Sequence, residues 1–188
     1  MKQLITLTFF LLTFTAFAQK PCEYSTNVTD SIGSYKVTNE YMVSEKYFGG
    51  TFDYVFFALA QTDGLPTLNL QLIQKSKDFI KANCFDKNSK IFLQLENGKI
   101  VTLIHIDKEN CGTLLHDEKG FDNRINTGIF MFMKDNFEDL KKSPISIMRI
   151  KYLTKVEDYI VKRDLTSELN GKLYHPNTYF MENIRCVE

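Results

Sequence analysis

Residues 89–106 read SKIFLQLENGKIVTLIHI, two apolar runs separated by Asn97-Gly98. Asn-Gly between two strand-like runs is typical of a hairpin, because a two-residue type I′ turn requires positive φ at both central residues. Such a turn predicts pairs whose residue numbers add up to 195, so that Leu95 faces Ile100. The predicted buried face carries Ile91, Leu93, Leu95, Ile100, Ile104 and Ile106. The other face carries Lys90, Gln94, Glu96, Lys99 and His105, and only Phe92, Val101 and Leu103 interrupt its polarity.

The same register predicts one of the disulfide bonds. Extended outward from the turn, it places Cys84 opposite Cys111. The chain has four cysteines, which allow three pairings, and an even number in an exported chain favours disulfides over metal ligands or nucleophiles. A Cys84–Cys111 bond leaves Cys22 to pair with Cys186, which closes a long loop and contributes about 4–5 kcal/mol in the chain-entropy model.

The first 18 residues have the features of a secretory signal peptide. Lys2 supplies a positive start, an uncharged apolar stretch follows, and Ala16-Phe17-Ala18 forms a cleavage site. The segment is too short for a convincing membrane span. We therefore expect an exported protein, periplasmic or secreted, with no membrane span after cleavage. Asn27 and Ser31 lie in short glycosylation motifs, which we interpret as unmodified turn residues.

Residues 19–188 are predicted to form a single exported domain of ordinary size. The full sequence has 23 basic and 23 acidic residues, and Lys2 lies in the predicted signal peptide, so the mature chain carries a net charge of −1. This balance, together with the absence of Trp, argues against a nucleic-acid-binding surface. No P-loop, Rossmann or G-x-S-x-G motif occurs, and no cofactor is expected.

The remaining pattern predicts a β-rich α+β fold, mainly antiparallel and curved, of about seven or eight strands with short helices near the C-terminus. Strands are expected over residues 35–46, 51–61, 67–75, 127–133, 145–154 and 156–162. Residues 68–82 also fit a helix. A short helix is predicted to start at Asp135, residues 164–170 to form one or two helical turns, and a last helix to reach Cys186. Residues 107–126 are predicted to be a long polar connection.

This connection and the end of the hairpin hold the candidate functional residues, which are His105, Asp107, His116, Asp117, Glu118 and Phe121. Two histidines beside carboxylates are compatible with a metal site, but their spacing matches no metal-binding motif, and we favour a solvated loop. Cys111 with His116 is compatible with a nucleophile pair, but an exported cysteine is expected to be oxidised. We therefore assign no catalytic or metal-binding residue.

The string NFEDLKKSPISIMRIKY (residues 136–152), the EDYIV strand and the late Cys186 resemble small exported proteins of Bacteroidota that have no assigned function. In that pattern, a hairpin flanked by cysteines precedes a short helix, a strand and a C-terminal cysteine. The resemblance covers residues 84–188. It implies an exported, β-rich protein and transfers no catalytic residue.

Two classes of function remain open. The first is an exported non-enzymatic domain that binds a protein or a cell-envelope component through the polar hairpin face and residues 107–126. The second is a hydrolase with its site in residues 105–126. A hydrolase predicts that His105, His116 and the nearby acids converge in one pocket, whereas a binding module predicts dispersed acids and an exposed apolar patch. The absence of a complete catalytic set favours the binding module.

Overall fold

The computed structural model describes residues 21–133 and 137–188. The predicted signal peptide, its cleavage site and the helix start at Asp135 lie outside the described residues. No helix among the described residues is long and apolar enough to cross a membrane.

Within the described residues, eleven strands form one antiparallel sheet in the order β1-β2-β4-β5-β9-β7-β6-β10-β11, with β3 paired to β4 and β8 paired to β9. The β-rich fold class and the short C-terminal helices are therefore confirmed, whereas the predicted number of seven or eight strands is too low. The strands are β1 (Tyr24–Thr29), β2 (Ser34–Thr38), β3 (Tyr41–Phe48), β4 (Thr51–Thr62), β5 (Leu65–Ser76), β6 (Lys90–Leu95), β7 (Ile100–His105), β8 (Thr113–His116), β9 (Asp122–Phe132), β10 (Ile145–Lys151) and β11 (Val156–Ile160).

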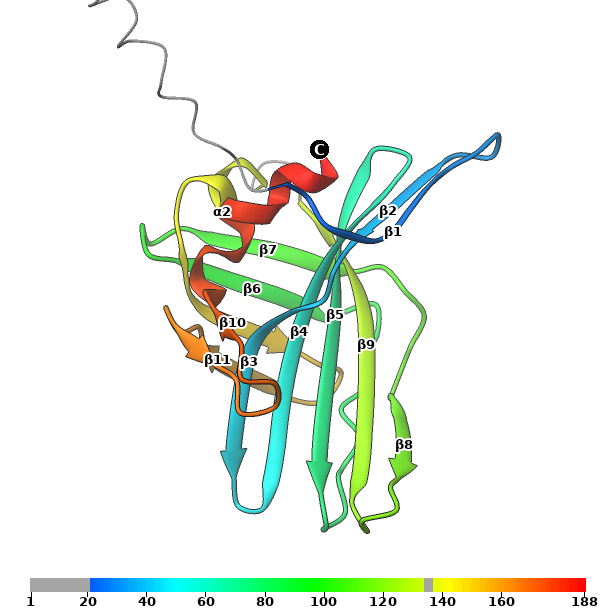
Figure 1. Cartoon of the computed structure of the whole chain (residues 1–188), viewed down its shortest axis with the longest axis vertical. Helices are drawn as coiled ribbons and strands as arrows, with labels where there is room; N and C mark the ends of the chain where they lie inside the picture. Colours follow the sequence, from blue (N-terminus) through cyan, green and yellow to red (C-terminus); the bar gives the residue numbers. More distant parts are fainter. Residues whose placement is uncertain (1–20, 134–136) are drawn as a thin grey trace, which may run out of the picture.

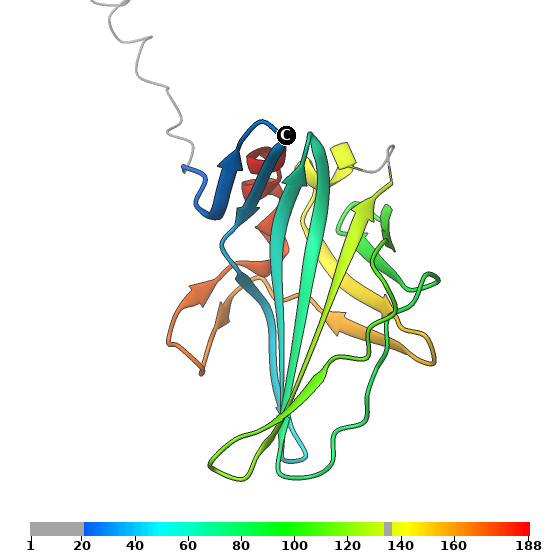
Figure 2. The ribbon, with the colours of Figure 1, turned by 90° about the vertical axis from the view of Figure 1, so that its right-hand side faces the viewer.

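The sheet folds back on itself. Strands β4, β5 and β9 are long and their axes are closely aligned in Figure 1, and β7, β6 and β10 run across them. In Figure 2, the two parts of the sheet are seen from the side, with the C-terminal helical segment at one end. That segment consists of α2 (Tyr179–Asn183) between 3-10 helices at Pro176–Thr178 and Ile184–Val187. A further 3-10 helix, Phe137–Lys141, precedes β10.

The core lies on the inner side of this fold. Val55, Phe57 and Leu59 of β4 pair with Leu72, Leu70 and Leu68 of β5, and all six side chains are buried. Phe180 of α2 closes the core, with its ring centroid 5.7 Å from that of Phe57 and 5.9 Å from that of Phe132. Burial of these apolar side chains is the main stabilising contribution.

Several strand boundaries differ from the prediction. Residues 35–46 form the two strands β2 and β3, which both pair with β4, and the polar connection contains β8 and the start of β9. Residues 68–76 are strand and not helix. The helical turns predicted over residues 164–170 are wrong, because Leu165–Thr166 (β12) pairs with Leu173–Tyr174 (β13) in a separate two-stranded sheet.

The predicted register of the central hairpin is wrong by one residue. The Gly98 N–H donates to the Leu95 carbonyl (3.0 Å) and the Leu95 N–H to the Lys99 carbonyl (2.9 Å), so the loop has three residues. Of the three loop residues, only Gly98 has positive φ (+83°), as expected for a type I turn followed by a left-handed glycine. The observed pairs add up to 194, with Ile91 opposite Leu103 and Leu93 opposite Val101.

A one-residue slip turns every side chain of the strand to the other face. Val101, Leu103 and His105 are therefore buried, whereas Ile100 is 58% exposed and Ile106 is 47% exposed. The predicted burial of Ile91, Leu93 and Leu95 on β6 is confirmed. The outer face of β7 consequently carries Ile100, Thr102 and Ile104 in place of the predicted Val101, Leu103 and His105.

Both predicted disulfides are present, Cys84–Cys111 and Cys22–Cys186. Phe85 pairs with Asn110, and these numbers add up to 195, so an irregularity between this bridge and the hairpin restores the predicted alignment at the cysteines. Tyr24 Oη also donates to the Cys186 carbonyl at 2.9 Å, which ties β1 to the C-terminal segment. Two disulfides indicate that the protein folds in an oxidising compartment.

Candidate functional site

The predicted hairpin register placed His105 on the solvent-facing side, but the structure places its side chain in the core. Its side chain is buried (5% exposed), its Nδ1 lies 3.0 Å from the Asp86 carbonyl, and its ring packs against those of Phe85 and Phe130. Burial lowers the pKa of His105 below 6.5, and the Asp86 carbonyl and the charges of Asp107 and Asp86 offset only part of this shift. A neutral, packed imidazole is part of the core.

We expect His105 to make stability depend on pH. Because its pKa is lower in the folded state than in the unfolded state, the unfolded chain binds a proton that the native protein excludes, and stability should fall as the pH drops below 6.5. In His105→Phe, the loss of urea stability between pH 6.5 and the folded-state pKa should be smaller than in the wild type. An identical pH slope in the two proteins would show that His105 is not responsible.

Three of the other candidate residues, His116, Asp117 and Phe121, lie around the turn between β8 and β9 and have protein partners there. His116 Nδ1 lies 2.9 Å from Asp122, and Asp117 accepts from Lys75 at 2.7 Å. The hydrogen bonds from Lys75 and from the Phe121 N–H hold the pKa of Asp117 well below its ordinary value. Lys75 Nζ also lies 4.7 Å from the centroid of the Phe121 ring. Glu118 and Asp107 are exposed.

The three histidines do not converge. His105 pairs with Phe130 and His116 with Asp122, eight residues apart on β9, which corresponds to about 26 Å along a strand. His175 binds Asp164, beside the small second sheet. Across residues 21–133 and 137–188, no group of three or more His, Cys, Asp or Glu side chains is arranged to hold a metal ion. His105 and His116 therefore do not share the pocket that the hydrolase alternative requires.

A different set of polar side chains does converge, on the inner face of the sheet below the core. Asp53 of β4, Gln74 of β5 and Arg124 of β9 are cross-strand neighbours in one row. They line a cavity of about 20 Å³, the space open to the centre of a water molecule, which is bounded on the opposite side by β11 and the end of β10. The full lining, which we call the inner cleft, is Asp53, Tyr54, Val55, Leu72, Gln74, Asn83, Arg124, Asn126, Tyr152, Glu157 and Tyr159.

The inner cleft adjoins a wider hollow. Gln74 and Asn83 line both, and the hollow has a volume of about 410 Å³. Its other walls are mostly small polar or charged residues, with the exposed ring of Phe79 (79%) at its rim. The combined site is narrow inside, where polar side chains lie among apolar and aromatic ones, and wide at its mouth.

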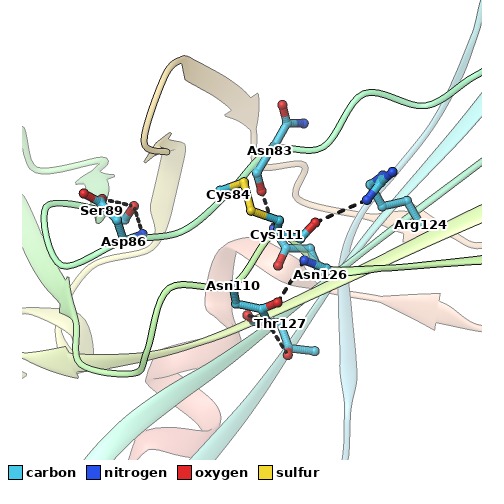
Figure 3. The surroundings of a disulfide bond; sticks show 10 residues. Asn83, Cys84, Asp86, Ser89, Asn110, Cys111, Arg124, Asn126 and Thr127 are labelled. Atoms are coloured by element: carbon cyan, nitrogen blue, oxygen red, sulfur yellow. Dashed lines mark hydrogen bonds between the residues drawn. A yellow bond between two sulfur atoms is a disulfide. The ribbon is translucent and has the colours of Figure 1, made fainter.

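The Cys84–Cys111 disulfide positions two side chains of the inner cleft (Figure 3). The Asn83 carbonyl, adjacent to Cys84, accepts from Asn126 Nδ2, and the Cys111 carbonyl accepts from Arg124 Nη1 at 3.3 Å. Arg124 Nε also donates to the Ile80 carbonyl at 3.1 Å. The bond thus joins the two segments whose carbonyls orient Asn126 and Arg124.

Two tyrosines form the opposite wall. The hydroxyl oxygens of Tyr152 and Tyr159 lie 3.4 Å apart, so each has hydrogen-bonding capacity left for a third group. Burial, with a contribution from Glu157, raises the pKa of both tyrosines above the ordinary 10, which keeps both as neutral hydroxyls. Glu157 is held by Lys155 at 2.8 Å, and Asp53 accepts from Gln74 at 2.6 Å.

One polar atom of the inner cleft has no protein partner. Asn126 is 4% exposed, and its Oδ1 accepts no hydrogen bond although its Nδ2 is bonded to Asn83. A buried carbonyl without a donor costs about 1–3 kcal/mol. Because Asn126 lines the cavity, a donor placed there by a ligand or a water molecule would recover this cost.

The chain matches no family model, no curated protein and no solved structure. The resemblance to exported Bacteroidota proteins therefore stays a prediction. The inner cleft was missed by the sequence analysis because its residues come from β4, β5, β9 and β11. One local signal was present. Arg124 and Asn126 lie on the same face of β9 as the buried Phe130, and the apolar Ile125 between them lies on the opposite face.

Proposed function

We propose that the protein is an exported, non-enzymatic binding module that holds a neutral sugar residue of a cell-envelope glycan in the inner cleft and its hollow. The observation that carries this proposal is the unpartnered Oδ1 of Asn126 in a cleft that combines polar side chains with the rings of Tyr152 and Tyr159.

The chemistry of the lining fits a polyol. A sugar hydroxyl both donates and accepts hydrogen bonds, and the cleft offers both functions on planar side chains: the carboxylate of Asp53, the amides of Gln74 and Asn126, and the guanidinium of Arg124. Tyrosine supplies an apolar ring face as well as a hydroxyl, which suits the mixed surface of a sugar.

The dimensions agree with this assignment. The inner cleft, at about 20 Å³, has room for one hydroxyl or hydroxymethyl group, whereas the hollow, at about 410 Å³, has room for a sugar ring. The sugar hydroxyl would donate to Asn126 Oδ1, and the ring would lie near Gln74 and Asn83, which line both spaces.

The test is a titration of the mature protein with glucose, galactose, mannose and N-acetylglucosamine. Binding is monitored through the backbone amide chemical shifts in NMR spectra. We expect saturable shifts in residues 53, 74, 124 and 126 with at least one of these sugars. Asn126→Leu should lower the affinity for that sugar about tenfold, because the substitution removes a hydrogen bond from a desolvated site.

Asn69→Leu is the matched control, because Asn69 Oδ1 is also buried without a partner but lies outside the inner cleft. Binding in this variant should equal that of the wild type. Thermal unfolding of both variants separates a loss of binding from a loss of folding. The absence of saturable shifts with all four sugars, or an equal loss in both folded variants, would refute the proposal.

A further inference from the structure

Among the described residues, the outer face of β7, β6, β10 and β11 carries exposed and half-buried side chains. Its central row is Thr102, Phe92, Arg149 and Asp158, and the row toward the hairpin turn is Ile100, Gln94, Ile147 and Ile160. Ile160 is 79% exposed and Ile100 is 58% exposed. A shallow groove of about 220 Å³ lies over this face, lined by Phe92, Gln94, Ile100, Ile147, Arg149 and Asp158.

The hairpin register decides which residues of β7 contribute to this surface. The three-residue turn directs Ile100 and Ile104 outward, next to Phe92 and Ile147. Under the two-residue turn that the sequence suggested, Val101 and Leu103 would have taken their places. An apolar surface beside a free sheet edge is the arrangement that proteins use to accept an added strand.

The edge beside this face is β11. Among the strands that the structure describes, none pairs with its outer side. The Val161 N–H donates to the Ser146 carbonyl (3.0 Å) and the Tyr152 N–H to the Lys155 carbonyl (2.9 Å), so Lys155, Glu157, Tyr159 and Val161 are the residues that bond to β10. In an antiparallel pair the intervening residues point their backbone groups the other way. Val156, Asp158 and Ile160 therefore present N–H and C=O groups to the open edge.

The charges favour an acidic partner over a second copy of this chain. Lys90, Arg149 and Lys151 lie on the outer face and Lys162 follows β11. The acid in the central row of the face, Asp158, is bound by Arg149 at 2.6 Å, and Glu96 at the hairpin turn lies 4.0 Å from Arg163. Two copies paired edge to edge about Asp158 would bring two carboxylates together and repeat the same lysines, which is unfavourable.

We propose that β11 accepts an extended segment of another protein as an added strand. The segment carries an apolar residue beside Ile160 and an acidic residue beside Val156, within reach of Lys151. This interaction uses the face opposite the inner cleft and does not depend on sugar binding.

The probe is a displayed library of random twelve-residue peptides selected on the mature, disulfide-bonded protein. We expect enrichment of peptides in which apolar residues alternate with polar or acidic ones. Ile160→Lys should weaken the selected peptides at least tenfold. Asp158→Pro should do the same, because it removes the N–H at the centre of the open edge.

Asp158→Ala is the matched control, because it also loses the ion pair with Arg149 but keeps the backbone N–H. It should retain binding within about threefold, since exposed ion pairs contribute little. Circular dichroism and thermal unfolding establish that each variant is folded. Peptides without alternation, or binding that persists in folded Asp158→Pro, would overturn the proposal. So would a concentration-dependent dimer that Asp158→Pro disperses, because the occupant would then be a second copy.

Discussion

Removal of the Cys22–Cys186 bond should destabilise the protein by about 5 kcal/mol. The two cysteines are 164 residues apart. In the chain-entropy model, the conformational entropy that a disulfide removes from the unfolded chain grows with the logarithm of the length of the loop it closes. A single domain has a total stability of about 5–15 kcal/mol, so this loss is a large part of the whole. The measurement is equilibrium urea unfolding of Cys22→Ala/Cys186→Ala against the wild type.

The second disulfide provides the matched control. Cys84 and Cys111 are 27 residues apart, for which the same model gives about 3.5 kcal/mol. Cys84→Ala/Cys111→Ala should therefore be the more stable of the two double variants. The reverse order would show that loop length does not determine the contribution of these bonds. If the first variant is unfolded in water while the second is folded, the predicted order holds.

Phe180→Ala should cost about 4 kcal/mol, the next largest effect. The side chain is 1% exposed and packs between Phe57 of β4 and Phe132 of β9, so its removal leaves a cavity at the point where α2 closes the fold. The expected result is a lower urea midpoint with an unchanged dependence of the unfolding free energy on urea concentration.

Met181→Ala is the control for this prediction. Met181 is the next residue of α2, 39% exposed, and its truncation should cost less than about 1 kcal/mol. Similar, small losses in the two variants would mean that the C-terminal segment rests on the sheet without contributing to the core.

The hairpin illustrates what the sequence could and could not predict. The alternation of β6 and the presence of a turn at Asn97-Gly98 follow from local residue preferences, and both are confirmed. The number of loop residues does not follow, because Gly98 suits a three-residue turn as well as a two-residue turn. The choice depends on which β7 residues can be buried: Val101, Leu103 and His105 face Phe85, Phe130 and the rest of the core.

The disulfide prediction was confirmed although its reasoning was only partly correct. The assumed register fails in the hairpin but holds at Phe85 and Asn110, next to the cysteines. The inner cleft lay outside such reasoning altogether. Asp53 and Gln74 face each other across the β4–β5 hairpin, but Arg124 joins them only because β9, which is distant in sequence, pairs with β5 in one particular register that no local pattern specifies.

The two disulfides are nested, with the loop from Cys84 to Cys111 inside the loop from Cys22 to Cys186. Because a chain is synthesised from its N-terminus, Cys22 meets two other thiols before its native partner arrives. A premature bond from Cys22 to Cys84 or Cys111 must be undone by thiol exchange before the protein can mature. Oxidative folding should therefore be slow without a disulfide isomerase, and the inner bond should be the first native bond to accumulate.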